Sequence, residues 1–319
     1  MPNEKPESLQ HPIDLSNTNL TRDCLAGEVA VITGSTSNVG FGFAQALAWA
    51  GAKVVITGRN DERGLVGEKQ INDQFGEGTA LYVHCDMTND DEVKAMCAKA
   101  IETFGKVDIL INNAMNLTLN GKILSSPVSD LDMSYMISAH GSMVAIKELV
   151  PALIERGHGV VTYSTTQFNY QPPMVGGAMY TTGKACATSL HMSLASECDG
   201  TGVNVFCFMP AGVGVQTPES VAHLADMGVD PNAPAPAMRG FHELVPPQAC
   251  GASMVHCILN AERLHKSTIG VSDALVDMDY PFPVPETAGP TMLPRIKDPM
   301  AITLLWLTLG EGFGGPTLE

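Results

Sequence analysis

The sequence predicts an α/β fold in which a parallel sheet carries helices on both faces. Short apolar runs rich in valine and isoleucine alternate with longer segments of helical periodicity, at a spacing typical of βαβ units. The first apolar run ends in a glycine-containing turn that leads into a helix. A later helix carries a tyrosine and a lysine four residues apart.

The predicted strands are short, apolar and rich in β-branched residues. They are expected at 29–33, 53–57, 80–85, 107–112, 159–163 and 203–208, with a seventh inside 267–277. The predicted helices lie between the strands and bury one face. They are expected at 41–50, 68–75, 91–104, 130–156, 178–197 and 249–260.

Composition divides the 319 residues into three parts. Residues 1–25 are polar and are predicted to form an N-terminal arm. Residues 26–280 contain all the predicted strands and form the main domain, in which the segment 216–248, rich in proline, alanine and methionine, is predicted to be an irregular substrate loop. Residues 281–319 form a C-terminal extension, which we expect to pack on the body of the protein or on a partner subunit.

The chain is acidic, with 34 Asp and Glu residues, 18 Lys and Arg residues and a net charge of −16. Long-range repulsion opposes binding to nucleic acid or anionic lipid, so we expect no nucleic acid or membrane partner. Uninterrupted apolar runs are shorter than the roughly 18 residues that span a bilayer. The first residues lack the apolar core of a signal peptide. We therefore expect a soluble, cytoplasmic protein.

The eight cysteines include no C-x-x-C pair, and the nine histidines lack the spacing of metal ligands. We interpret the cysteines as small buried residues. We expect no metal site.

The segment 33–42 joins the first strand to the first helix and is rich in glycine and small polar residues. Glycine lets the backbone approach a pyrophosphate, and the helix N-terminus supplies N–H donors and a partial positive charge. Its place between a strand and a helix is the context that a dinucleotide site requires. The residues expected to hold the phosphates are Gly34, Ser35, Thr36, Ser37, Asn38, Val39 and Gly40.

The end of the second strand favours NADP(H) over NAD(H). An acidic residue there would bond the ribose 2′-hydroxyl, but this chain has Gly58 followed by Arg59. A guanidinium can pair with a 2′-phosphate, although an ordinary surface arginine would look the same. Asp61 and Glu62 follow, somewhat late in the chain for the ribose.

Two further strand ends are predicted to contact the cofactor. Asp86 and its neighbour Met87 follow the third strand and are placed at the adenine edge; the alternative role of Asp86 is to cap the next turn. Asn112, Asn113 and Ala114 end the fourth strand beside the expected nicotinamide ribose. Their alternative role is to satisfy backbone groups.

Tyr180 and Lys184 stand four residues apart in a predicted helix and therefore share a helical face. An ammonium beside a phenol favours the phenolate, so we expect the pKa of Tyr180 to be lowered. Such a tyrosine can pass a proton near neutral pH, as reduction of a carbonyl requires. Without the upstream turn, a core tyrosine and a solvated lysine would be the simpler interpretation.

Taken in order, these motifs resemble those of the short-chain dehydrogenase/reductase (SDR) superfamily over residues 26–279. The resemblance implies a Rossmann-type, doubly wound parallel seven-stranded sheet and hydride transfer between a nicotinamide and a carbonyl or alcohol carbon. It also implies a homodimer or homotetramer formed through the helices at 130–156 and 178–197.

The resemblance assigns catalytic roles to five residues. Tyr180 would be the general acid or base, and Lys184 would also hold the nicotinamide ribose. Thr165 or Ser164 would hydrogen-bond the carbonyl oxygen. Ser138 stands where the family has an asparagine that relays protons.

The turn and the segment after the sixth strand depart in part from the family pattern. Asn38 replaces the middle glycine of the turn, and asparagine is the residue other than glycine that best tolerates a left-handed backbone. The family's Pro-Gly becomes Pro210-Ala-Gly212, and Pro210, Gly212 and Val213 are predicted to contact the cofactor.

We therefore predict an NADP(H)-dependent oxidoreductase that reduces a ketone or aldehyde to an alcohol, or catalyses the reverse. The substrate is expected to be medium-sized and largely apolar. Besides the segment 216–248, the residues that could line its pocket are Met115, Leu117, Phe168, Tyr170, Met174 and Val213.

Three alternatives stay open. The departures at Asn38, Ser138 and Thr165 favour a dinucleotide-binding regulatory protein that has lost catalysis. An NAD-dependent alcohol dehydrogenase would differ in its cofactor preference. An enoyl reductase would space its tyrosine and lysine further apart, and Ala178, six residues before Lys184, opposes that interpretation.

Overall fold

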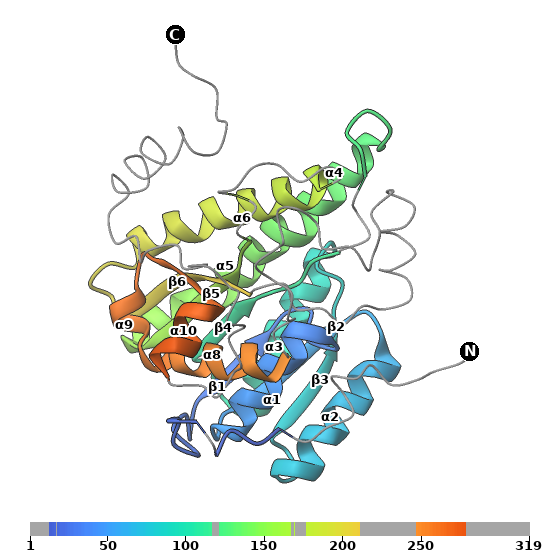
Figure 1. Ribbon diagram of the computed structural model, residues 1–319. Helices are drawn as coiled ribbons and strands as arrows, with labels where there is room; N and C mark the ends of the chain where they lie inside the picture. The colour runs from blue at the N-terminus through green and yellow to red at the C-terminus, as the bar shows by residue number, and fades with distance from the viewer. Residues whose placement is uncertain are drawn as a thin grey trace, which may run out of the picture.

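The computed structural model describes residues 13–16, 18–116, 121–166, 169, 177–210 and 247–278. Seven strands form one parallel sheet of order β3-β2-β1-β4-β5-β6-β7, with helices on both faces (Figure 1). This arrangement confirms the predicted Rossmann-type, doubly wound sheet. The strand order reverses between β1 and β4, and open α/β sheets bind ligands beyond the carboxyl ends of their strands at such a point.

The strands are β1 (Val29–Ile32), β2 (Lys53–Gly58), β3 (Ala80–His84), β4 (Ile109–Asn112), β5 (Gly159–Ser164), β6 (Val203–Met209) and β7 (Thr268–Gly270). The helices are α1 (Asn38–Trp49), α2 (Asp61–Phe75), α3 (Asp90–Phe104), α4 (Val128–Tyr135), the π-helix η2 (Met136–His140), α5 (Gly141–Arg156), α6 (Ala178–Glu197), α8 (Pro247–Leu259), α9 (Ala261–Leu264) and α10 (Val271–Asp277).

The side chains of each strand alternate between two helical layers. Ile32 and Ile56 point into the layer that contains α1, α2, α8, α9 and α10. Val31 and Val55 point into the layer that contains α3, α5 and α6. Because both faces are covered, the central strands are apolar along almost their whole length, as expected for a parallel sheet.

Part of the predicted N-terminal arm packs into the α1 layer. Gln74 of α2 donates to the backbone carbonyl of Ile13 at 2.7 Å and accepts from its N–H at 3.3 Å. Four apolar side chains of this segment are buried in the core, namely Ile13, Leu15, Leu20 and Leu25. Most of the predicted substrate loop and the C-terminal extension lie outside the described residues.

Helix α2 begins at Asp61, earlier than the predicted start of the helix at 68–75. Asn60 caps it, because its side chain accepts a hydrogen bond from the first turn. Gly64 lies in this first part of the helix, under the ring of Tyr82. The glycine therefore serves close packing between α2 and β3 rather than ending the helix.

The predicted helix at 130–156 is helical along its whole length. The π-helix η2 lies within it and joins α4 directly to α5. By length and composition alone, Val128–Arg156 could cross a membrane. Charged residues such as Lys147 and Glu148 break its sequence into shorter apolar runs, which is why the sequence showed no long one. More than half of its most apolar part is buried, and it packs on α3 and α6 as a core helix does.

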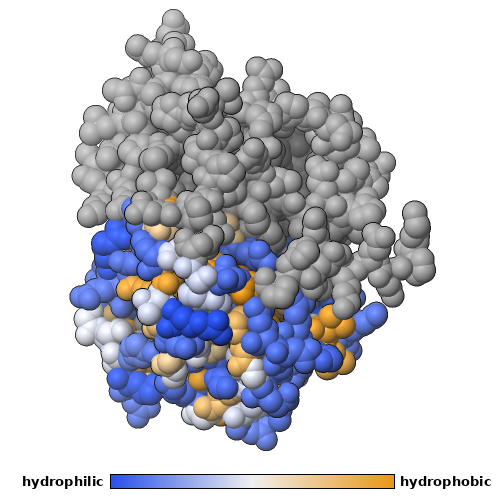
Figure 2. All heavy atoms as spheres, turned by 60° about the horizontal axis from the view of Figure 1, so that its bottom comes forward, coloured by the Kyte–Doolittle hydropathy of each residue, from blue (hydrophilic) through white to orange (hydrophobic). Residues whose placement is uncertain are grey.

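When the bottom of Figure 1 is turned toward the viewer, the described residues on that side are mostly polar, with apolar residues scattered singly or in small groups (Figure 2). The most exposed large apolar side chains lie around the start of α4, where Leu124 is fully exposed and Val128 is 75% exposed. The oligomeric state stays a prediction.

Replacing Gly64 by alanine is expected to lower the free energy of unfolding by roughly 1–3 kcal/mol. A Cβ atom at this position would lie 2.1–2.4 Å from three carbons of the Tyr82 ring. That ring cannot move away easily, because its hydroxyl donates to the Gly58 carbonyl or the Asp61 carboxylate, each 2.8 Å away. Urea denaturation measures the change. In a Tyr82→Leu background the alanine should be tolerated, and an equal loss in both backgrounds would exclude this clash.

Candidate active site

The glycine-rich turn between β1 and α1 packs closely against the end of β4. Gly34 has a φ of 62°, and a Cβ on it would lie 2.7 Å from the Ala114 Cα. A Cβ on Gly40 would lie 2.5 Å from the Gly34 oxygen and 2.6 Å from the Asn113 Nδ2. The Asn113 amide donates to the carbonyls of Thr33 and Gly34 at 3.0 and 3.1 Å. Both glycines are therefore required, and Asn113 holds the turn in place.

The start of α1 is open to an anion. Asn38 has a φ of 50°, so asparagine does adopt the left-handed backbone of the glycine that it replaces. Its Oδ1 is buried and has no hydrogen-bond partner among the described residues. Ser37 makes no side-chain cap, and the first turn of α1 has no acidic residue. The N–H donors at this end therefore fit a pyrophosphate.

Three other residues of the turn serve the fold. The Ser35 hydroxyl donates to the Ile32 carbonyl at 2.6 Å and accepts from the Thr57 N–H at 2.9 Å. Thr36 packs against Gly58 at the end of β2. Val39 is partly buried against the α1 layer.

Arg59 and Asp86 face each other at the ends of β2 and β3, with 3.7 Å between Nη1 and Oδ2. Asp86 also accepts from the N–H and the hydroxyl of Thr88 at 2.9 and 2.8 Å. Burial opposes its ionisation, but the Thr88 bonds and the Arg59 charge outweigh this, so the pKa of Asp86 is lowered. Asp86 thus caps the turn, and Met87 is buried in the layer that contains α3, α5 and α6.

Asp61, at the start of α2, is already engaged. Its Oδ1 accepts from the Tyr82 hydroxyl at 2.8 Å and lies 2.7 Å from the His84 Nδ1. The contact with His84, and then the bond from Tyr82, lower the pKa of this carboxyl. This network leaves Arg59 as the exposed charged side chain that directly follows β2, with 58% of its side chain accessible.

Tyr180 and Lys184 leave the same face of α6 beside the carboxyl end of β5. The Lys184 Nζ lies 5.9 Å from the centre of the Tyr180 ring and 4.9 Å from that of Tyr163. The same Nζ donates to the Ser164 carbonyl, and the whole side chain is buried. The structure therefore brings the predicted pair together.

Loss of contact with water shifts the pKa of both groups, with Lys184 buried and Tyr180 half-buried. It raises the pKa of Tyr180, and a hydrogen bond with Thr166 offsets this only in part. It lowers the pKa of Lys184 to about 7. The expectation that Lys184 lowers the pKa of Tyr180 is therefore wrong in this structure. Loss of water raises the pKa of the phenol, and the same loss of water lowers the pKa of the amine.

Thr165 faces α6, but its hydroxyl is already used. The Thr188 hydroxyl gives its proton to the Lys184 carbonyl at 2.7 Å, so Thr165 must be the donor in the 2.6 Å pair between the two hydroxyls. Asn169 donates to the Thr165 oxygen at 3.2 Å. Ser164 is buried on the opposite face of the strand, toward the α1 layer, and its hydroxyl has no partner among the described residues.

Thr166 is the hydroxyl residue that contacts Tyr180, and the sequence analysis missed it. The sequence placed this role at Thr165 or Ser164, at the end of the fifth predicted strand. The signal in the sequence was that a further hydroxyl residue directly follows Thr165.

Ser138 lies in η2 and is fully buried. Its hydroxyl donates to the Met115 sulfur at 3.1 Å, so the proton that a water relay would use is engaged with a thioether. A π-helical segment is frequent at functional sites. The relay through Ser138 stays a prediction.

The structure describes only part of the predicted cofactor and substrate contacts. Pro210 follows β6 and is partly buried. The predicted residues that lie outside the described ranges are Gly212, Val213, Leu117, Phe168, Tyr170 and Met174.

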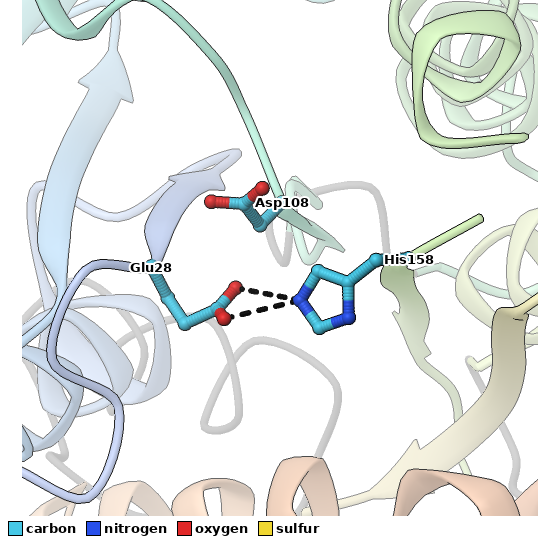
Figure 3. A group of neighbouring side chains, drawn as sticks. All are labelled: Glu28, Asp108 and His158. Carbon is cyan, nitrogen blue, oxygen red and sulfur yellow. Dashed lines mark hydrogen bonds and ion pairs between the residues drawn. The ribbon is translucent and has the colours of Figure 1, made fainter. Parts of the chain in front are cut away.

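A group of possible metal ligands lies at the opposite, amino edge of the sheet. Ligand atoms of Glu28, Asp108 and His158 lie within 4.8 Å of one another (Figure 3). Asp108 already pairs with Lys106 at 2.9 Å and with Arg156 at 3.3 Å, and His158 lies 3.0 Å from Glu28. Because a metal ion would compete with two cations, we interpret the group as an ion-pair network joining the starts of β1, β4 and β5.

All eight cysteines lie in the described ranges and are free. Six are buried, Cys24 is partly buried and Cys186 is exposed. They therefore act mainly as small core residues.

The stability of the protein should depend on pH through Lys184. Its pKa is about 7 in the fold against an ordinary 10.5, so the unfolded chain binds more protons between these values. The free energy of unfolding should then rise with pH above 7, relative to Lys184→Met, by up to about 1.4 kcal/mol per pH unit. Urea denaturation of both proteins from pH 6 to 9 measures this difference. A difference that is constant with pH would contradict the burial of the amine.

Known proteins resemble this chain in sequence and in structure. Residues 28–224 match the family model of short chain dehydrogenases. The (21S)-21-acetoxyl-apo-melianone synthase SDR of Melia azedarach is 31% identical over 208 residues, which cover 65% of this chain and 72% of that protein.

Two solved structures share the fold. A 7α-hydroxysteroid dehydrogenase in complex with NADH and 7-oxo glycochenodeoxycholic acid is 25% identical with a TM-score of 0.65, over 78% of this chain and 94% of the other. The L-sorbose reductase of Gluconobacter frateurii, in complex with NADPH and L-sorbose, is 24% identical with a TM-score of 0.67, over 77% and 95%. The chain belongs to the short-chain dehydrogenase/reductase superfamily of oxidoreductases.

Proposed function

We propose that this protein is an NADP(H)-dependent oxidoreductase that reduces a ketone or aldehyde to an alcohol, or catalyses the reverse. The observation that carries the proposal is the pair Tyr180 and Lys184, packed together on α6 at the edge of the sheet that also holds the glycine-rich turn. Family membership supports hydride chemistry. The ketone bound to the similar hydroxysteroid dehydrogenase supports an apolar carbonyl substrate.

The residues around the turn fit a dinucleotide. Gly34 and Gly40 let the turn pack closely against the end of β4, and the N–H groups at the start of α1 have no side-chain cap. When bound, the nicotinamide cofactor supplies or accepts the hydride. Asn113 holds the turn in place through its bonds to the Thr33 and Gly34 carbonyls. Lys184 would hold the ribose hydroxyls beside the reacting ring.

Tyr180 would give its proton to the oxygen that gains charge as the carbonyl is reduced. Its raised pKa keeps the phenol protonated at neutral pH, which is the form that a general acid needs. The bond from Thr166 favours the phenolate that proton transfer leaves behind. Lys184, when charged, also favours the phenolate, because its Nζ lies 5.9 Å from the centre of the Tyr180 ring.

The hydroxyl that hydrogen-bonds the carbonyl oxygen is proposed to be Thr166. Thr165 spends its proton on Thr188, and Ser164 faces the other layer of the sheet. Thr166 lies beside the phenol that would protonate the same oxygen. A donor placed there would steady the negative charge on that oxygen during the reaction.

Two alternatives keep support from particular contacts. Asp86 partly neutralises Arg59, and the similar hydroxysteroid dehydrogenase binds NADH, which together favour NAD-dependent alcohol oxidation. The commitment of Ser138 to Met115 and of Thr165 to Thr188 favours a dinucleotide-binding regulatory protein. NADPH binding without turnover on a broad panel of ketones and aldehydes would support the regulatory protein.

Assembly and location complete the proposal. We expect a homodimer or homotetramer built through the α4–α5 stretch and α6, and the exposed Leu124 and Val128 near the start of α4 support it. We also expect a cytoplasmic protein.

Tyr180→Phe is expected to lower turnover at least 100-fold, because positioned acid catalysis is worth roughly 10²–10⁴-fold. The dissociation constant for NADPH should stay nearly unchanged, since the phenol hydroxyl acts on the substrate. Steady-state kinetics and fluorescence titration measure the two effects. Tyr135→Phe, at a half-exposed tyrosine on α4, is the matched control. Full activity in Tyr180→Phe would exclude Tyr180 as the general acid or base.

Arg59→Ala is expected to weaken NADPH binding at least tenfold and to leave NADH binding nearly unchanged. A hydrogen-bonded charge pair with the 2′-phosphate is worth roughly 1.5–3 kcal/mol, and only NADPH carries that phosphate. Titration with both cofactors measures the ratio. Arg63→Ala, an exposed arginine on α2, should not change it. An equal effect of Arg59→Ala on both cofactors would remove Arg59 as the selecting residue.

A further inference from the structure

The inward face of α6 continues beyond the catalytic pair. His191 lies seven residues after Lys184, so it lies two turns further along the same face. It is fully buried, and its ring stacks on the ring of Tyr163 with 4.8 Å between centres and 20° between planes. Tyr163 is also fully buried, on the side of β5 that faces α6.

The hydrogen bonds of His191 fix its ring in the neutral form. Its Nδ1 lies 2.7 Å from the Ala187 carbonyl, which can only accept, so Nδ1 carries the proton. Its Nε2 then accepts from the Asn112 amide nitrogen at 2.9 Å. Burial, and to a lesser extent the charge of Lys184, lower the pKa of His191 to about 4. The imidazole is therefore uncharged, and its ring is held by two hydrogen bonds against the ring of Tyr163.

The Lys184 amine lies between two aromatic rings. Its Nζ is 4.9 Å from the centre of the Tyr163 ring and 5.9 Å from that of Tyr180, both within the range of a cation–π contact. Among the described residues it makes no ion pair with a carboxylate. The titratable groups that face it are Tyr180 and His191 on α6, Tyr163 on β5 and Cys207 on β6.

The Tyr163 ring, rather than its hydroxyl, makes this contact. The hydroxyl is buried and has no hydrogen-bond partner of normal geometry among the described residues. The Ser138 hydroxyl is close enough to act on the Tyr163 pKa but donates to Met115 instead. The ring stacks on His191 and lies against the Lys184 amine, so the ring is the part of Tyr163 that contacts the site.

We propose that Tyr163 and His191 are positioning residues for Lys184. The imidazole of His191, which is hydrogen-bonded to Asn112 at the end of β4, holds the Tyr163 ring in place. In that position the π-electrons of the ring stabilise the Lys184 ammonium in a site with little water. Asn112 is followed directly by Asn113, whose amide holds the glycine-rich turn. Contacts through Asn112, His191 and Tyr163 therefore connect that turn to Lys184. The inference rests on the proposed function of Lys184.

The test reads the pKa of Lys184 directly, by ¹³C NMR of lysine-labelled protein with Lys184→Met to assign the resonance. Tyr163→Leu should lower this pKa by roughly 0.5–1 unit and kcat about tenfold, because the cation–π contact is lost. Tyr163→Phe keeps the ring, so it should leave both quantities unchanged. Phe206→Leu removes a buried ring on β6 that faces the α1 layer, and it should lower stability without moving the Lys184 pKa.

Several results would overturn the proposal. An unchanged Lys184 pKa in Tyr163→Leu, or the same shift in Tyr163→Phe, would do so. Should Tyr163→Leu fail to fold, His191→Leu decides the matter, because it removes the ring that stacks on Tyr163. An unchanged Lys184 pKa in His191→Leu would contradict the proposal. The titration needs no turnover, so its outcome is separate from that of the Tyr180→Phe assay, which tests the proposed function itself.

Discussion

The exclusion of water between β5 and α6 is the constraint on which the candidate site depends. It leaves Lys184 with the Ser164 carbonyl and two aromatic rings as its neighbours. In such surroundings a charged form costs more than in water, so the amine titrates near neutrality and the neighbouring phenol keeps its proton. Both groups thereby fit acid catalysis of carbonyl reduction, by a physical route that differs from simple attraction between a cation and a phenolate.

The fold creates this dry boundary from two periodic patterns. Alternate residues of β5 point toward α6, so Tyr163 and Thr165 face the helix while Ser164 faces the other layer. On α6, the side chains that meet them recur at helical spacing, from Tyr180 and Lys184 to His191. The parallel sheet then places the end of β5 at the same edge as the turn after β1.

The sequence predicted the parts of the molecule that depend on local pattern. Apolar runs and helical periodicity gave the strands and their order of connection, and the rarity of a left-handed backbone outside glycine and asparagine made Asn38 interpretable. The helix before β3 was predicted too short, and the structure shows that it also includes Gly64, which lies under the ring of Tyr82. Contacts between elements decide such cases.

Burial was the quantity that the sequence could not supply. The pKa of Tyr180 was predicted in the wrong direction because the spacing to Lys184 is visible in the sequence and the loss of water is not. Thr166 was missed because three hydroxyl residues stand in a row at the end of β5, and the fold decides which of them contacts Tyr180. His191 stands on the same helical stripe as Lys184 and could have been noticed, but its stacking on Tyr163 depends on the sheet.

The most direct test of this account is the titration of the Tyr180 phenol itself. Tyrosine labelled with ¹³C at Cζ gives one resonance for each of the six tyrosines, and Tyr180→Phe assigns the one that matters. We predict that this resonance does not titrate below the ordinary tyrosine pKa of about 10. A titration midpoint near pH 8 or lower would contradict it, because it would show that the ammonium, and not the loss of water, governs the site.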